Sequence, residues 1–281
     1  MGKFARSWAL AKASFGVLRS DKELLVFPLV SVIAVLLVVA SFVLPMFGLG
    51  LFREFEADGA MPPVFYLWLF AFYLVQYFVI FFFNAALVGA AMVRLDGGDP
   101  TVGTGLRIAA GKWKQILGYA AIAATVGMLL RAIEQRAGFI GRIVVGLIGV
   151  AWTVATFLTV PLLVARDIGP IDAVKESASL LGRTWGENLI GNGGIGLAMG
   201  LLNVLVVFVG VAAVVFFATQ GMAVLAVTAA VVGVLAVLSL ALVHAALSGI
   251  YSAALYRFAM QGDAAAGFDG MLLREAFQRK L

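Results

Sequence analysis

The stretch that decides the fold is residues 189–256, LIGNGGIGLAMGLLNVLVVFVGVAAVVFFATQGMAVLAVTAAVVGVLAVLSLALVHAALSGIYSAALY, which contains no Asp, Glu, Lys or Arg. As one α-helix this run would extend for about 100 Å, whereas the hydrocarbon core of a bilayer is about 30 Å thick. The run must therefore fold back, and Thr219, Gln220 and Gly221 supply its best turn signal. The sequence predicts two antiparallel transmembrane helices here.

Four further uncharged runs precede this hairpin and bring the prediction to six spans. They are Leu24–Phe52, Met61–Val93, Gln115–Leu130 and Ile143–Ala165. Hydrophobic residues make up 63% of the 281-residue chain and charged residues 12%, whereas about a quarter of the residues in soluble domains are charged. A transmembrane β-barrel is disfavoured because its strands alternate apolar and polar residues. We predict an all-α, polytopic transmembrane helical bundle.

The basic residues lie mainly on one side of the predicted spans. Sixteen of the 20 Lys and Arg residues fall before the first span, between the second and third spans, between the fourth and fifth spans, or after the sixth span. The other four fall in the opposite loops. Such a bias places the basic segments in the cytoplasm. We therefore expect both termini to be cytoplasmic. We interpret the net charge of +5 as facing anionic lipid headgroups rather than nucleic acid.

The segments on this basic side are predicted to be amphipathic helices that lie at the membrane surface. Residues 4–18, 102–117 and 171–185 each repeat apolar side chains at helical spacing, with basic residues beside them and one tryptophan. Tryptophan and arginine are typical of the membrane interface. The predicted interfacial anchors are Trp8, Trp113, Trp185, Arg94, Arg166 and Arg257.

The same segments predict an internal threefold repeat within one membrane domain. Arg94 to Pro100 follows the second span, Arg166 to Pro170 follows the fourth, and each places proline where an interfacial helix would begin. We expect three units, at roughly 1–93, 94–165 and 166–256, each with one interfacial helix and two spans, and a cytoplasmic tail at 257–281.

A few polar residues within the spans are the candidate site. Asn84, Asn203 and His244 fall near the predicted bilayer midplane. Gln76 lies deeper on the second span, and Ser248 lies one turn from His244 on the sixth. Polar residues at this depth are costly and often functional, so they could form a solute or proton site. They could equally form interhelical hydrogen bonds that stabilise packing by about 1 kcal/mol each. Both interpretations stay open.

No catalytic or cofactor-binding motif accompanies these residues. The chain has one histidine, no cysteine and no Gly-x-Ser-x-Gly or His-Glu-x-x-His pattern. We therefore expect no enzyme activity, no bound metal and no cofactor.

The end of the fourth span resembles a known element of prokaryotic membrane proteins. Val160-Pro-Leu-Leu-Val-Ala-Arg-Asp-Ile-Gly-Pro170, followed by Ala173-Val-Lys-Glu-Ser-Ala-Ser-Leu-Leu-Gly-Arg-Thr-Trp185, resembles the membrane domain of some glycerophosphodiester phosphodiesterases and its uncharacterised six-helix relatives. The resemblance implies a six-helix bundle in the prokaryotic inner membrane. It does not extend to a phosphodiesterase catalytic domain, so that hydrolase activity is not expected.

Two functional hypotheses follow. The first is a non-catalytic integral membrane protein that organises lipid or partner proteins at the cytoplasmic leaflet, because three basic amphipathic segments border that leaflet. The alternative is a small-solute transporter or channel that uses the midplane polar residues. Expected partners are membrane lipids with anionic headgroups, with a second copy of the chain or another protein left open.

Overall fold

The computed structural model describes residues 3–48, 63–185 and 194–261, and every regular element in them is a helix. Six of these helical segments are long and apolar enough to cross a membrane, which confirms the all-α polytopic bundle. In chain order the elements are α1 (Lys3–Ser20), the 3-10 helix η1 (Lys22–Leu25), α2 (Val26–Gly48), α4 (Pro63–Leu95), α5 (Val102–Gly111), α6 (Trp113–Arg136), α7 (Phe139–Ala155), α8 (Thr159–Ala165), α9 (Pro170–Trp185), α10 (Gly194–Thr219) and α11 (Ala223–Gln261).

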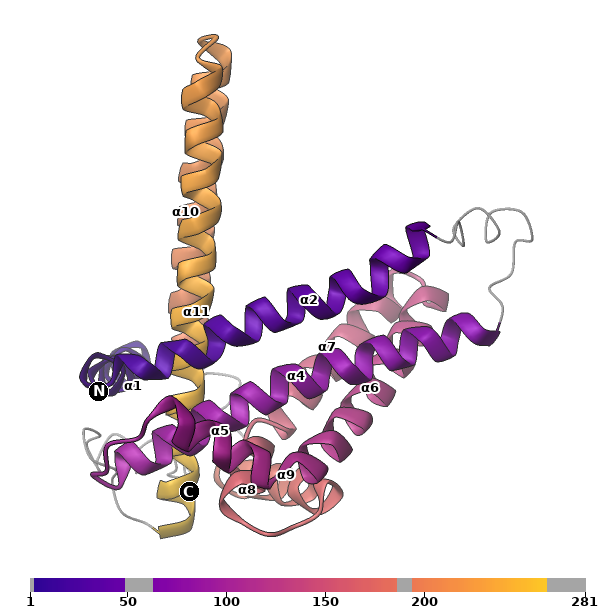
Figure 1. Ribbon diagram of the computed structural model, residues 1–281, viewed down its shortest axis with the longest axis vertical. Coiled ribbons are helices and arrows are strands. Elements are labelled where there is room, and N and C mark those ends of the chain that lie inside the picture. Colours follow the sequence, from indigo (N-terminus) through magenta and orange to yellow (C-terminus); the bar gives the residue numbers. More distant parts are fainter. Residues whose placement is uncertain (1–2, 49–62, 186–193, 262–281) are drawn as a thin grey trace.

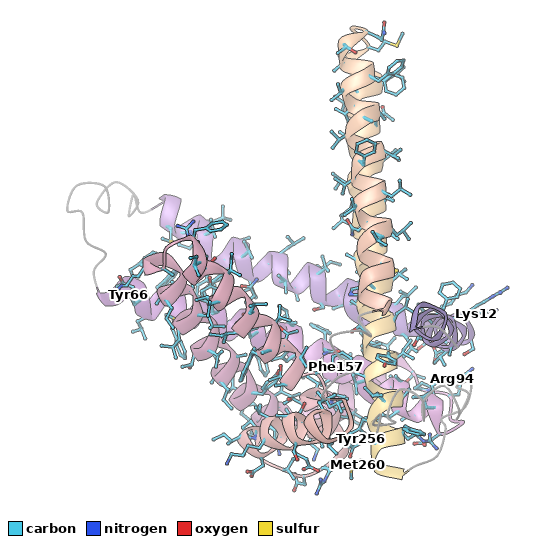
Figure 2. All side chains as sticks on the ribbon, turned by 180° about the vertical axis from the view of Figure 1, so that it is seen from behind. Lys12, Tyr66, Arg94, Phe157, Tyr256 and Met260 are labelled. Carbon is cyan, nitrogen blue, oxygen red and sulfur yellow. The ribbon has the colours of Figure 1, made fainter. Side chains whose placement is uncertain are left out.

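Helices α10 and α11 form the predicted hairpin. The turn lies between Thr219 and Ala223, and Gly221 adopts a φ of 72°, a left-handed conformation that glycine reaches without steric cost. The hairpin stands apart from the other long helices, which run side by side as a second arm (Figure 1). Its exposed side chains are mostly apolar, as expected for a surface that contacts lipid (Figure 2).

The two arms meet at one end of the molecule, which we call the basal end. Here α1, η1, α5, α8 and α9 form a basal layer around the last turns of α11 and α4. Most of the fully buried residues lie here, including Leu24, Phe27, Leu162 and Ile250. The opposite, distal end of the second arm carries Tyr66, far from Tyr256 and Met260 (Figure 2).

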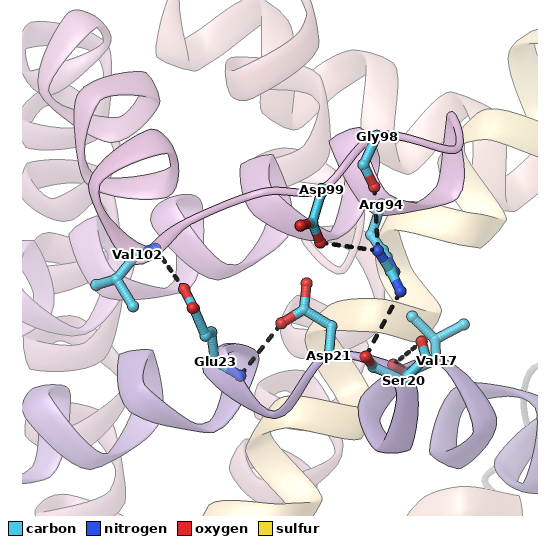
Figure 3. Close-up of polar contacts among 8 residues, drawn as sticks. All are labelled: Val17, Ser20, Asp21, Glu23, Arg94, Gly98, Asp99 and Val102. Carbon is cyan, nitrogen blue, oxygen red and sulfur yellow. Dashed lines mark hydrogen bonds and ion pairs between the residues drawn. The ribbon is translucent and has the colours of Figure 1, made fainter.

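Polar contacts fasten the junction of α1 and η1 to the end of α4 and the start of α5 (Figure 3). The Glu23 carboxylate accepts the backbone N–H of Val102 at 3.0 Å and so caps the N-terminus of α5 from another segment. Arg94 donates to the Asp99 carboxylate at 3.0 Å and to the backbone carbonyl of Ser20 at 3.5 Å. These bonds hold the first and second interfacial segments together.

Asp21 lies at the same junction and has an unusual environment. One of its carboxylate oxygens accepts the backbone N–H of Glu23 at 3.2 Å, whereas the other is buried without a hydrogen-bond partner. Burial disfavours the charged form and raises the pKa of Asp21 above its ordinary value of 3.8, although the nearby Arg94 opposes the shift.

The span expected at Ile143–Ala165 is interrupted. Helix α7 ends at Ala155 and α8 begins at Thr159, just before Pro161, which has no N–H for a helical bond. Ser177 of α9, which is 0% exposed, fills the gap. Its hydroxyl accepts the Leu158 N–H at 3.1 Å and donates to the Ala155 carbonyl at 2.6 Å. A side chain of the basal layer therefore completes the backbone hydrogen bonding of a membrane span.

The internal repeat, the side on which the termini lie and the C-terminal tail were also predicted from the sequence. Short helices α1, α5 and α9 each precede a pair of long helices, yet the threefold repeat stays a prediction. The cytoplasmic position of the termini stays a prediction as well. Helix α11 continues to Gln261, into the expected tail at 257–281, and residues 262–281 of that tail lie outside the described residues.

Candidate functional site

A cavity of about 380 Å³ lies where the last part of α11 crosses the second arm. Residues of α2, α4, α6, α7, α8 and α11 line it, together with the interruption between α7 and α8. We call it the central cavity and define it by its polar lining residues, Ser31, Asn84, Tyr119, Thr153, Thr156, His244, Ser248 and Ser252. The rest of its lining is apolar or glycine.

The structure brings together three of the five sequence-predicted residues. Asn84, His244 and Ser248 all line the central cavity. Gln76 lies two turns, or about 12 Å, further along α4 toward the distal end. Asn203 lies on α10, which packs mainly against α11 and α1. Neither of these two residues is part of the cavity lining.

Helices α4 and α11 approach closely at the cavity wall. A Cβ atom placed on Gly249 would lie only 2.5 Å from Cδ2 of Leu87 and 3.6 Å from Oδ1 of Asn84. Gly249 therefore lets the Asn84 amide reach the same helix that carries His244 and Ser248. Small residues serve this purpose in membrane proteins because they allow close helix approach.

His244 has an unmet hydrogen-bonding requirement. Its Nδ1 atom is buried and has no hydrogen-bond partner within the protein, although the side chain lines the cavity. A buried polar atom without a partner costs about 1–3 kcal/mol. A water molecule or a bound ligand in the cavity would satisfy this atom once a rotation of the imidazole exposes Nδ1 to the cavity.

The remaining cavity chemistry is suited to uncharged groups. The Thr156 and Ser252 hydroxyls donate to the carbonyls of Trp152 and Gly249, both at 2.9 Å, which leaves their lone pairs as acceptors. Among the described residues that line the cavity there is no Asp, Glu, Lys or Arg. The arrangement therefore offers hydrogen bonds without a fixed countercharge.

Sequence reasoning missed part of this site. His244, Ser248 and Ser252 recur at every fourth residue of one helix, so their shared face was available as a signal. Tyr119, Thr153 and Thr156 had no such signal, because only the packing of α6 and the interrupted span brings them to the cavity.

An aromatic ladder extends from the central cavity toward the distal end. The rings of Phe81 and Tyr119 stack with centroids 4.4 Å apart. Tyr77 stacks on Phe81 at 5.6 Å, and Tyr73 stacks on Tyr77 at 6.3 Å. The ladder therefore follows one face of α4 from Phe81, beside the central cavity, to Tyr73.

The predicted interfacial anchors lie around the basal layer. Trp113 is 47% exposed, and the Lys114 ammonium lies 5.7 Å from its ring centroid. Trp8 and Trp185 lie on α1 and α9, but their side chains are outside the described residues. The three arginines form ion pairs within the protein: Arg94 with Asp99, Arg166 with Glu176, and Arg257 with Asp96.

The chain belongs to a family of unknown function, DUF6159, whose model matches residues 63–268. The matched range includes α4 through α11, and therefore most of the central cavity lining. No curated protein and no solved structure matches the chain. The resemblance to the membrane domain of glycerophosphodiester phosphodiesterases is not shown by these comparisons, so the chain is assigned to an uncharacterised family and no further.

Proposed function

We propose that the protein binds a small, uncharged polar solute in the central cavity and carries it across the membrane. The observation that carries this proposal is the buried Nδ1 of His244, which lacks a protein partner in a cavity large enough to hold a ligand. Interhelical packing alone would leave this atom unsatisfied, whereas a bound solute with a hydroxyl or amide group would bond it after a rotation of the imidazole exposes Nδ1 to the cavity.

The interrupted span supports the same function. Non-helical backbone at membrane depth is tolerated where protein buries it or where it lines a cavity, and discontinuous helices form the substrate sites of many transporters. In this protein Thr156 and Phe157 of the interruption, and Val160 just after it, all line the central cavity. The interruption is therefore part of the cavity wall rather than a remote irregularity.

The cavity also limits the class of solute. Its volume of about 380 Å³ lies toward the small end of the range of about 300–1,000 Å³ for ligand sites. Because its described lining has no fixed charge, an ion would lose its hydration without an opposite charge in return. We propose a small polyol, amide or similar neutral molecule.

The proposed orientation follows the charge bias. The basal layer would face the cytoplasm of a prokaryotic cell and the distal end the opposite side, because the basic segments lie in that layer. Labelling of single cysteines introduced at Lys12 and at Arg136 with a membrane-impermeant reagent tests this placement, since the native chain has no cysteine.

Solute flux in proteoliposomes tests the transport proposal. The purified protein is reconstituted, and entry of glycerol or urea is followed by stopped-flow light scattering. We expect His244→Ala with Asn84→Ala to lower the protein-dependent flux at least tenfold. Ser239→Ala is the matched control, because Ser239 is exposed on the same helix and bonds only to the Leu235 carbonyl at 2.8 Å. Equal flux in the double variant and the control would refute the proposal.

A second candidate function is the organisation of lipid at the basal end. Lys12, Phe15 and Arg19 lie exposed on one face of α1, where two basic side chains are available to anionic headgroups and a phenyl ring is available to the apolar part of the lipid. We expect Lys12→Gln with Arg19→Gln to reduce the anionic lipid and the partner proteins that copurify with the chain. Unchanged recovery of both would exclude this role.

A further inference from the structure

A second pocket lies at the distal end, between the far ends of α4, α6 and α7. Its volume is about 600 Å³, and it is separate from the central cavity. We call it the distal pocket. Its polar lining residues are Tyr73, Tyr77, Arg131, Glu134, Gln135 and Arg142.

One of its two guanidinium groups is held in place by neighbouring side chains. Arg131 donates from Nη1 to the Tyr73 hydroxyl at 2.8 Å. The Tyr73 ring is itself held by stacking on Tyr77 at 26°. A Cβ atom on Gly127 would lie 3.3 Å from the Tyr77 hydroxyl, so glycine lets this phenol pack close to α6. The binding groups are therefore partly preorganised.

The charges in the pocket suit a singly charged phosphate diester. Arg131 and Arg142 contribute two positive charges and Glu134 one negative charge, which leaves one net positive charge in the lining. Arginine is well suited to phosphate oxygens because its guanidinium offers several N–H donors in one plane. The Glu134 carboxylate can accept a hydrogen bond from an ammonium or hydroxyl group in the rest of the headgroup.

The surroundings of the pocket distinguish a lipid from a free anion. Phe139, three residues before Arg142 on α7, is 81% exposed, and the apolar side chain of Leu130 on α6 is itself part of the pocket lining. Apolar side chains exposed at the end of membrane spans contact acyl chains, which a free phosphate does not have. A headgroup site with adjacent acyl-chain contacts matches the chemistry of a whole phospholipid.

We propose that the distal pocket binds the phosphodiester headgroup of a membrane phospholipid, with Arg131 and Arg142 holding the phosphate. The site is independent of solute transport, because none of its residues lines the central cavity. The lipid comes from the leaflet that surrounds the distal end.

Native mass spectrometry of the delipidated full chain tests the proposal, with phosphatidylglycerol and diacylglycerol of the same acyl chains as probes. We expect phosphatidylglycerol to bind at least tenfold more tightly than diacylglycerol. Arg131→Gln with Arg142→Gln should remove most of this difference. Arg136→Gln, an exposed residue outside the pocket lining, should leave it unchanged.

Three outcomes would overturn the proposal. The first is equal binding of the two lipids. The second is full phosphatidylglycerol binding in the double variant. The third is calorimetric binding of inorganic phosphate that competes with the lipid at equal concentration, which would make the pocket a free-anion site.

If the double variant fails to fold, Tyr73→Phe provides a second test, because it keeps the ring and removes only the hydroxyl partner of Arg131. Lipid binding should then weaken severalfold, and unchanged binding would also overturn the proposal.

Discussion

Replacement of Ser177 by alanine tests how the interrupted span is held together. The Ser177 hydroxyl bonds both the Leu158 N–H, which is buried, and the Ala155 carbonyl, which is part-buried, where α9 packs against α7 and α8. A buried backbone group without a partner costs about 1–3 kcal/mol. Because alanine leaves two such groups, and the chain can relax in part, we expect the free energy of unfolding to fall by about 2–4 kcal/mol.

Unfolding of the detergent-solubilised protein, followed by tryptophan fluorescence, measures this loss. Ser179→Ala is the matched control, since Ser179 is exposed two residues further along α9. A surface substitution of this kind changes the free energy of unfolding by about 0.5 kcal/mol or less. If the two variants unfold within about 0.5 kcal/mol of each other, the serine does not hold the interruption and the reasoning is wrong.

The same logic predicts a coupling between Ser177 and Pro161. In Ser177→Ala, a second change of Pro161→Ala supplies a backbone N–H and removes the ring that opposes a continuous helix. The span can then close its own hydrogen bonds. We expect the double variant to recover part of the stability lost in the single variant, and additive losses would contradict this account.

Two further predictions concern stability. The raised pKa of Asp21 means that the folded state favours its protonated form, so wild-type stability is lost as pH rises from 3.8 through the raised value. Asp21→Asn should therefore gain stability over the wild type as the pH rises above 3.8 in melting experiments, and a more stable wild type at pH 7 would refute this. Gly249→Ala should lower the free energy of unfolding by about 1–3 kcal/mol because its Cβ meets Leu87 at 2.5 Å, whereas Gly146→Ala, with no atom within 4 Å, should raise it by about 0.5–1 kcal/mol. Equal effects at the two glycines would contradict the close contact.

The features that the sequence predicted well depend on composition and local signals. The six spans follow from long uncharged runs, because lipid admits only backbone that is internally hydrogen bonded. The hairpin turn follows from a glycine with polar neighbours between two such runs. The shared depth of Asn84 and His244 follows from their similar distances to a basic span end, whereas their convergence depends on which helices pack together.

Depth alone could not place Asn203. Its distance along the chain matched that of the other polar residues, but α10 leaves the bundle with α11 and does not reach the central cavity. Which helices are neighbours depends on tertiary packing, and a sequence without charged pairing residues in its spans gives little information about it. The same reason explains Gln76, whose depth was recognised but whose position beyond the cavity was not.

The role of Ser177 was hidden because it joins two features that the sequence presents separately. Pro161 marks a helix irregularity, and Ser177 is one small polar residue on the amphipathic helix α9. Only the hydrogen bonds of Ser177 to Leu158 and Ala155 show that the serine supplies partners for backbone groups of the interruption. Since Thr156 and Phe157 of that region also line the central cavity, the position of α9 in the basal layer and the shape of the cavity wall are linked. A displacement of α9 that withdraws Ser177 would leave the Leu158 N–H and the Ala155 carbonyl, which flank cavity-lining residues, without partners. We therefore expect the cavity wall to shift when α9 moves.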